Sequence, residues 1–175
     1  METFTEFKPL VKNPYFHQQR EKSLNQLDIN TIDAPIKEII KGFSNLPYCF
    51  TLQSCYGHFL YNNQKNPNNI EPLLSLDKIT KVEYRIAYIA LCIQNNPPGR
   101  MLLQELKKIP AIDPDYVQFG CADWFWKRQV NSYALQVEPE RYKTKDKITV
   151  NFQEALHIEN VRNEFFRRLE KIFDK

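Results

Sequence analysis

The densest group of reactive side chains in this chain is a five-residue turn. Ser54, Cys55, Tyr56, Gly57 and His58 place a hydroxyl, a thiol, a phenol and an imidazole around one of only four glycines. A thiol beside an imidazole suits nucleophilic or metal chemistry, because the thiolate is the reactive form of cysteine and imidazole stabilises it. We therefore predict a ligand pocket at this turn, with His58 and Cys55 as catalytic residues and with Ser54, Tyr56 and Gly57 binding the ligand.

The same turn has other interpretations. Cys55 can pack inside while His58 only caps the turn. A zinc site is another interpretation, because Cys49, Cys55 and His58 follow a C-x5-C-x2-H spacing that Cys121 or His157 would complete. Structural zinc sites usually show closer pairs such as C-x2-C, which this sequence lacks. We therefore assign no metal ligands, and keep a thiol- or metal-dependent enzyme using Cys55 and His58 as an alternative.

Charged residues gather a second time after a predicted strand that ends near residue 137. Glu138, Glu140 and Arg141 set two carboxylates and a guanidinium close together. We expect Glu138 and Arg141 to lie near the turn and bind the same ligand. Basic residues follow them and are suited to phosphate contacts, although such charges are more often solvated. They are Lys143, Lys145 and Lys147.

The segment 123–128 interleaves aromatic and basic residues, which can stack a base or a planar ligand. The competing interpretation is a buried turn, and we assign Trp126 to the core. Glycine-rich phosphate loops are excluded, because the glycines are too far apart for a Walker or dinucleotide motif. They are Gly42, Gly57, Gly99 and Gly120.

The elements that position these residues follow from hydrophobic periodicity. We predict helices over 18–26, 100–109 and 154–173, a helix with Asp33 as N-cap, and strands over 48–53, 82–94, 116–121, 132–137 and 148–152. Strict βαβ alternation is absent, so we expect one α+β domain with a mainly antiparallel sheet, flanking helices and a long C-terminal helix. Residues 1–17 are expected to form an extended arm, and the Asn-rich segment 61–69 a mobile loop.

The last helix carries its apolar residues at helical spacing, from Ile158 to Ile172. We place its basic residues on the opposite, solvated face, interleaved with Glu159, Glu164 and Glu170. These basic residues are Arg162, Arg167, Arg168 and Lys171.

The composition predicts a cytoplasmic protein. No apolar run reaches the 18 residues of a membrane helix, and the N-terminus is acidic where a signal peptide would be basic. Two core-like cysteines, Cys49 and Cys92, lie in apolar runs. The net charge of +3 is too small to indicate nucleic-acid binding by itself.

The order of these features resembles one known family. Leu27-Asp28 precedes a helix that begins at Ile32-Asp33, and an aromatic strand then runs into the Ser54–His58 turn. A strand over 133–137 precedes the closing helix with its Asn160, Asn163 and Arg167. The chain is similar over about 19–173 to the wybutosine-synthesis tRNA methyltransferases, whose turn reads Ser-Cys-Ser-Gly-Arg.

Ser54, Cys55 and Gly57 match that turn, while Tyr56 replaces the second serine. His58 replaces the arginine, which would remove a permanent cation. The resemblance implies an α+β fold, S-adenosylmethionine as cofactor, and tRNA as partner. We therefore expect a divergent relative that binds a nucleotide, nucleoside or adenosyl ligand at the turn and modifies RNA. The alternative from another class is a non-enzymatic binding or interaction protein.

Overall fold

Helices and strands are mixed along the chain in the computed structural model, which describes residues 4–5, 7–73, 79–142 and 145–174. The α-helices are α1 (Phe16–Gln26), α2 (Lys37–Asn45), α3 (Pro97–Leu106), α4 (Asp123–Arg128) and α5 (Phe152–Glu170). Short 3-10 helices are η1 (Ile29–Thr31), η2 (Ala34–Ile36), η3 (Ile109–Ile112) and η4 (Glu140–Tyr142). The strands are β1 (Phe4–Thr5), β2 (Cys49–Cys55), β3 (His58–Leu60), β4 (Lys81–Arg85), β5 (Ala87–Ile93), β6 (Val117–Ala122), β7 (Ser132–Val137) and β8 (Lys147–Asn151).

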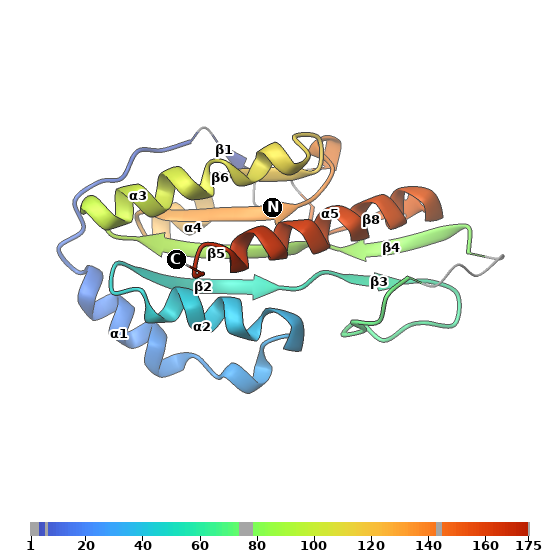
Figure 1. The fold of residues 1–175 in the computed structure, drawn as a ribbon, viewed down its shortest axis with the longest axis horizontal. Helices are drawn as coiled ribbons and strands as arrows, with labels where there is room; N and C mark the ends of the chain where they lie inside the picture. The colour runs from blue at the N-terminus through green and yellow to red at the C-terminus, as the bar shows by residue number, and fades with distance from the viewer. Residues whose placement is uncertain (1–3, 6, 74–78, 143–144, 175) are drawn as a thin grey trace.

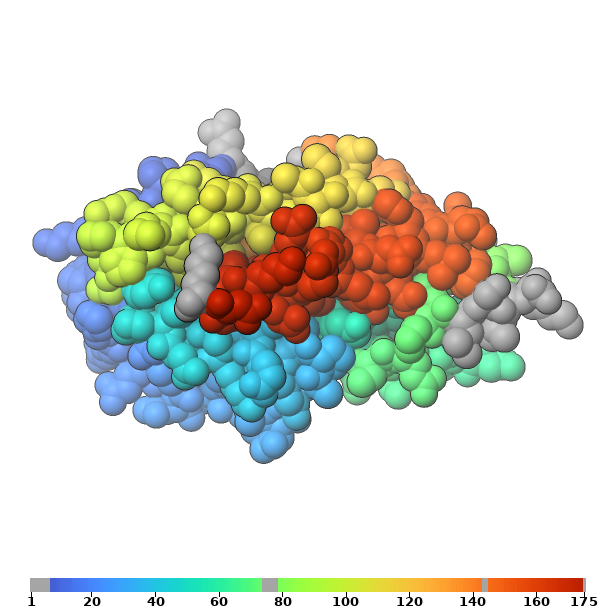
Figure 2. Space-filling model, viewed as in Figure 1, coloured from blue at the N-terminus to red at the C-terminus, as the bar shows by residue number. Residues whose placement is uncertain are grey.

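The strands form two antiparallel sheets. One has the order β1-β6-β7-β5-β2 and the other the order β3-β4-β8. The helices α3 and α5 lie across the sheets, and α1 and α2 pack against the edge strand β2 (Figure 1). Figure 2 shows α5 between η3 on one side and α2 on the other. The predicted α+β fold with an antiparallel sheet and a long C-terminal helix is confirmed.

Two chain segments run through both sheets as one antiparallel ribbon. Cys55 faces Tyr88 at the end of the β2–β5 pair, and His58 faces Arg85 at the start of the β3–β4 pair, so the register is unchanged across the junction. The prediction of one strand over 82–94 is wrong, because pairing stops at Ile86. Before Ile86 this segment pairs on its outer side with β8, and after Ile86 it pairs with β7.

Gly57 makes the junction in this ribbon. Its φ is 90°, and a Cβ built on it would lie 2.8 Å from the Cβ of Ala87, so only glycine suits the position. In an uninterrupted strand, side chains three residues apart point to opposite faces. The interruption instead lets Cys55 and His58 approach each other. The fold thereby builds the candidate site.

The core bears out several sequence-based assignments. Cys49 and Cys92 are fully buried, and Trp126 packs on the core with its ring edge-on to Tyr133. Segment 123–128 forms the short helix α4 rather than a buried turn, and it leaves Trp124 exposed. No helix among the described residues is both long and apolar enough to cross a membrane.

The placement of basic residues on α5 needs a correction. Arg162 was expected on the solvated face, but it is 2% exposed, and Glu159 is 8% exposed. Arg162 lies four residues after Ile158 and three before Phe165, so helical spacing brings it to the flank of the buried face.

Two other predictions concern mobile or terminal segments. Within 61–69, Tyr61 and Gln64 form a backbone bridge, and the amide of Gln64 donates to the carbonyl of Phe59. The mobility of this loop stays a prediction. Residues 1–3 and 6 of the expected arm, and the basic residue Lys143, lie outside the described residues.

Candidate functional site

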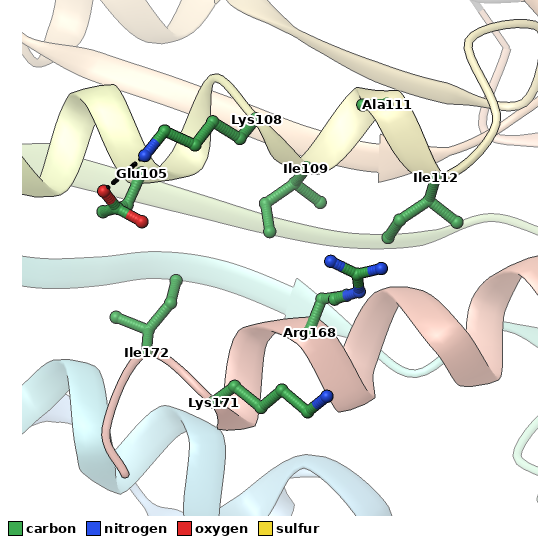
Figure 3. Close-up of a pocket in the computed structure, with 8 residues that line it drawn as sticks. All are labelled: Glu105, Lys108, Ile109, Ala111, Ile112, Arg168, Lys171 and Ile172. Carbon is green, nitrogen blue, oxygen red and sulfur yellow. Dashed lines mark hydrogen bonds and ion pairs between the residues drawn. The ribbon is translucent and has the colours of Figure 1, made fainter. Parts of the chain in front are cut away.

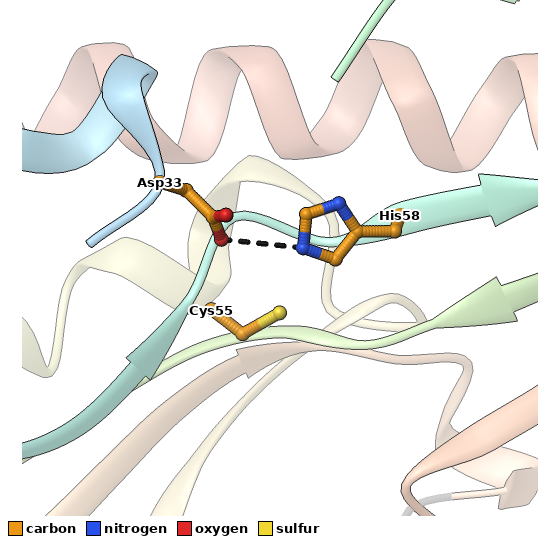
Figure 4. Close-up of side chains that lie close together, drawn as sticks. All are labelled: Asp33, Cys55 and His58. Atoms are coloured by element: carbon orange, nitrogen blue, oxygen red, sulfur yellow. Dashed lines mark ion pairs between the residues drawn. The ribbon is translucent and has the colours of Figure 1, made fainter. Parts of the chain in front are cut away.

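Three side chains with metal-binding or catalytic chemistry meet at the junction of the two sheets. Asp33 precedes η2, Cys55 ends β2 and His58 begins β3 (Figure 4). One carboxylate oxygen, the thiol sulfur and one imidazole nitrogen all lie within 4.8 Å of one another. Within the part of the chain that the structure describes, no other group of three or more His, Cys, Asp or Glu residues is arranged in this way.

His58 is held at both ring nitrogens. Nε2 lies 3.2 Å from Oδ2 of Asp33, and Nδ1 lies 2.9 Å from the carbonyl oxygen of Asn69. The hydrogen bond to Asp33, followed by that to Cys55, raises the pKa of His58 to about 10 against the effect of burial. His58 is therefore an imidazolium at neutral pH. The turn therefore contains a buried cation.

Asp33 is bound to the turn rather than to the helix that follows it. Its Oδ2 accepts the backbone N–H of Tyr56 at 2.9 Å. Burial acts to raise the pKa of Asp33, but the hydrogen bonds from His58 and Tyr56 and the charge of His58 outweigh it and lower that pKa. Asp33 does stand at the N-cap position, that of the short helix η2, but its side chain makes no capping hydrogen bond there or to α2.

The second carboxylate oxygen of Asp33 is available to a ligand. Among the described residues, Oδ1 makes no hydrogen bond or ion pair, while Oδ2 makes both of those just described. The side chain of Asp33 is 22% exposed, whereas that of His58 is 5% exposed. A partly accessible carboxylate oxygen therefore lies beside a buried cation.

The remaining turn residues have distinct roles. The N–H of Gly57 donates to Sγ of half-buried Cys55 at 3.4 Å. The ring of Tyr56 stacks on Phe166 at a centroid separation of 5.4 Å, so its backbone N–H, and not its ring, serves the cluster. Ser54 lies on β2 opposite Ile89 and is half-buried. Its ligand-binding role stays a prediction.

Arg162 supports the turn from α5 and was not predicted to do so. Its Nη1 donates to the carbonyl of Gly57 at 2.9 Å, and its guanidinium lies 4.0 Å from the ring centroid of Tyr56. Glu159 lies 3.8 Å away and also accepts the N–H of Leu73 at 2.8 Å. The sequence does carry a signal for the burial of Arg162, because it follows the buried Ile158 by four residues, about one helical turn.

Glu138 and Arg141 make their described contacts elsewhere. Glu138 is fully buried and accepts from the side chain of Gln136 and from the N–H of Lys145. Burial raises the pKa of Glu138 to about 8. Arg141 is paired with Glu154. None of these partners belongs to the turn, so a shared pocket stays a prediction.

Tyr84 links this region to the turn. Its hydroxyl donates to the carbonyl of Val137 and accepts the N–H of Ala87, both at 2.8 Å. Val137 precedes Glu138, and Ala87 lies against Gly57. The buried Tyr84 side chain therefore connects the two regions.

The zinc ligand set considered from the sequence does not assemble. Cys49 lies six residues before Cys55 on the same strand, which corresponds to about 20 Å of extended chain. Cys121 accepts the N–H of Lys8, and His157 pairs with Asp113 at 2.8 Å. Asp33, which sequence reasoning assigned to a helix cap, replaces them beside Cys55 and His58.

A cavity of about 280 Å³ lies between η3 and the end of α5 (Figure 3). Its walls combine basic side chains with apolar ones and include none of the turn residues. The lining residues are Glu105, Lys108, Ile109, Ala111, Ile112, Arg168, Lys171 and Ile172. Lys108 pairs with Glu105 and Arg168 with Glu164, which offsets part of the positive charge.

Comparison with known proteins supports the fold alone. No protein-family model and no curated protein sequence matches the chain. Among solved structures, the PH1069 protein from Pyrococcus horikoshii is similar, with a TM-score of 0.51 and 12% identity. The match covers 91% of this chain and 93% of that protein. At this identity the likeness concerns the path of the backbone and not the chemistry of the site.

Proposed function

We propose that the protein binds the nucleoside part of an adenosyl or nucleotide ligand at Asp33 and the Ser54–His58 turn. The observation that carries this proposal is the accessible Oδ1 of Asp33 beside the junction of the two sheets. Carboxylate oxygens are common acceptors for ribose hydroxyls in dinucleotide sites. Such an acceptor suits S-adenosylmethionine, the cofactor implied by the resemblance, as well as free nucleosides.

The charge balance of the site favours a nucleoside over a phosphate. Asp33 and His58 neutralise each other, and both nitrogens of His58 already have acceptors. A phosphate would therefore gain little from this pair, whereas a neutral ribose needs only a hydrogen-bond acceptor. We place the ribose at Asp33 and the rest of the ligand along Ser54 and Cys55.

The proposed enzyme class is a cytoplasmic RNA-modifying enzyme. With its pKa raised to about 10 and both ring nitrogens hydrogen-bonded, His58 is suited to hold Asp33 in place and not to act as a base. The cations of the cavity between η3 and α5 would contact tRNA phosphates. These are Lys108, Arg168 and Lys171. Binding through such contacts weakens steeply with salt, so a tRNA mobility shift at low salt should vanish at high salt.

The ligand is tested by thermal unfolding with S-adenosylmethionine, S-adenosylhomocysteine, adenosine and AMP. A ligand at 100 times its Kd stabilises the folded state by about 2.7 kcal/mol. For a chain of this size that is a rise in Tm of roughly 5–10 °C. We expect S-adenosylmethionine, S-adenosylhomocysteine and adenosine each to raise Tm.

Asp33→Asn keeps the size of the side chain, but its one oxygen is needed to accept the N–H of Tyr56, so a donor replaces the acceptor for the ribose. The variant should abolish most of the ligand-induced rise in Tm. Asp113→Asn is the matched control, because Asp113 also pairs with a histidine, His157, but lies away from the turn. Equal shifts in the two variants, or no shift with any of the four ligands in the wild type, would refute the proposal.

A further inference from the structure

We infer that Asp33, Cys55 and His58 form a binding site for one transition-metal ion, of which zinc fits the donors best. The inference goes beyond the proposed function and does not depend on it, because it needs no nucleoside. It rests on the convergence of three different ligating groups and on the hydrogen bonds that orient each of them.

The spacing of the donor atoms matches a tetrahedral ion. Zinc bonds of about 2.0–2.3 Å to nitrogen, oxygen and sulfur place neighbouring ligand atoms about 3.4–3.6 Å apart. Nε2 of His58 and Oδ2 of Asp33 are separated by 3.2 Å, and Sγ of Cys55 completes a group within 4.8 Å. Donor separations therefore need to change by at most about 1.4 Å to bring all three donors to bonding distance.

Each donor also has the outer hydrogen bond that metal ligands usually have. The carbonyl of Asn69 accepts a hydrogen bond from Nδ1 of His58, which leaves Nε2 facing Asp33. The N–H of Tyr56 donates to Asp33, and the N–H of Gly57 donates to Sγ of Cys55. The backbone of the turn thus orients Asp33 and Cys55, and the carbonyl of Asn69 orients His58, before any ion binds.

The donor types select among metals. A thiolate, an imidazole and a carboxylate suit zinc, whereas magnesium and calcium prefer oxygen ligands alone. Three protein ligands leave the fourth position to water or substrate, as in catalytic zinc sites. Asp33 and Cys55 are only partly buried, so solvent reaches part of the cluster.

The test uses the whole chain, stripped with a chelator and then titrated with Zn²⁺ or Co²⁺ in the absence of nucleosides. We expect one ion per chain by elemental analysis after equilibrium dialysis. Co²⁺ should give the visible bands of a tetrahedral site and a near-ultraviolet thiolate charge-transfer band.

Cys55→Ser, a nearly isosteric change, should abolish the charge-transfer band. Asp33→Asn and His58→Ala should each weaken metal binding at least tenfold. His157→Ala is the matched control and should keep both the stoichiometry and the spectrum, because His157 lies with Asp113 away from the cluster. If His58→Ala does not fold, Cys55→Ser and Asp33→Asn still decide the matter.

Fewer than one tightly bound ion per chain in the wild type, or a charge-transfer band that survives in Cys55→Ser, would overturn the inference. The two proposals fail separately. A nucleoside-induced rise in Tm with no metal bound would remove only the metal site, and stoichiometric metal with no such rise would remove only the nucleoside site.

Discussion

Replacing Gly57 by alanine tests whether the junction between the two sheets builds the site. The added Cβ would lie 2.8 Å from the Cβ of Ala87 and 3.1 Å from its backbone nitrogen, at a φ of 90°. Neither neighbour is the far end of a flexible side chain. The variant must therefore strain its own backbone, displace β5, or do both.

The expected loss of stability has two parts. A non-glycine residue in a sparsely populated backbone region costs about 1–3 kcal/mol. Inserting a methyl into a tightly packed site costs about another 1–3 kcal/mol. We expect the free energy of unfolding to fall by about 2–6 kcal/mol, measured by urea denaturation. The Tm should fall by roughly 4–24 °C.

A double-mutant cycle separates the two parts. Ala87→Gly removes the methyl that clashes, so in the Gly57→Ala background it should restore about 1–2 kcal/mol while the backbone strain remains. Ala90→Gly is the matched control, because Ala90 is a buried alanine on the same strand and faces Gln53. Its effect should add to that of Gly57→Ala without coupling.

Two results would refute this reasoning. One is a Gly57→Ala variant within about 0.5 kcal/mol of the wild type, and the other is equal coupling with Ala87→Gly and Ala90→Gly. A separate readout concerns the site. If Gly57→Ala is destabilised as expected but keeps the cobalt spectrum of the wild type, the junction does not bring Cys55 and His58 together.

Two further perturbations address buried charges. Burial raises the pKa of Glu138 to about 8 from an ordinary value of 4.5, so its contribution to stability is complete below pH 4.5 and is lost as the pH rises toward 8. The free energy of unfolding should fall by roughly 3–5 kcal/mol over this pH range, and in Glu138→Gln, measured by urea denaturation at each pH, it should change much less. An equally steep fall in the variant would contradict the role of Glu138. Arg162→Met removes the cation that contacts Gly57 and leaves Glu159 buried without it, so unfolding free energy should fall by about 3 kcal/mol. Arg168→Met, on the exposed face of the same helix, should stay within about 0.5 kcal/mol, and similar losses in both variants would argue against a supporting role for Arg162.

Local patterns were sufficient for the fold class and for the location of the turn. Apolar spacing marked α5, and the apolar runs around Cys49 and Cys92 marked two core residues, because burial of one face imposes a period on the sequence. The concentration of polar groups at Ser54–His58 marked the junction between the sheets. The glycine at its centre was the sign of unusual backbone geometry.

Long-range contacts decided the composition of the site. Asp33 has the residue type and position of a helix cap, yet its carboxylate accepts a hydrogen bond from the N–H of Tyr56, 23 residues later. The acceptor for Nδ1 of His58 is the backbone carbonyl of Asn69. Every residue has such a carbonyl, so the sequence does not indicate which one His58 contacts.

The sequence by itself determined most of the helices and strands and where its reactive groups concentrate, because both depend on neighbours within a few residues. Only the tertiary structure decided that Asp33 joins Cys55 and His58 and that Arg162 is buried behind Gly57. Those choices depend on which chain segments meet across the junction of the two sheets. A hydrogen bond between residues far apart in the chain leaves no period in the sequence.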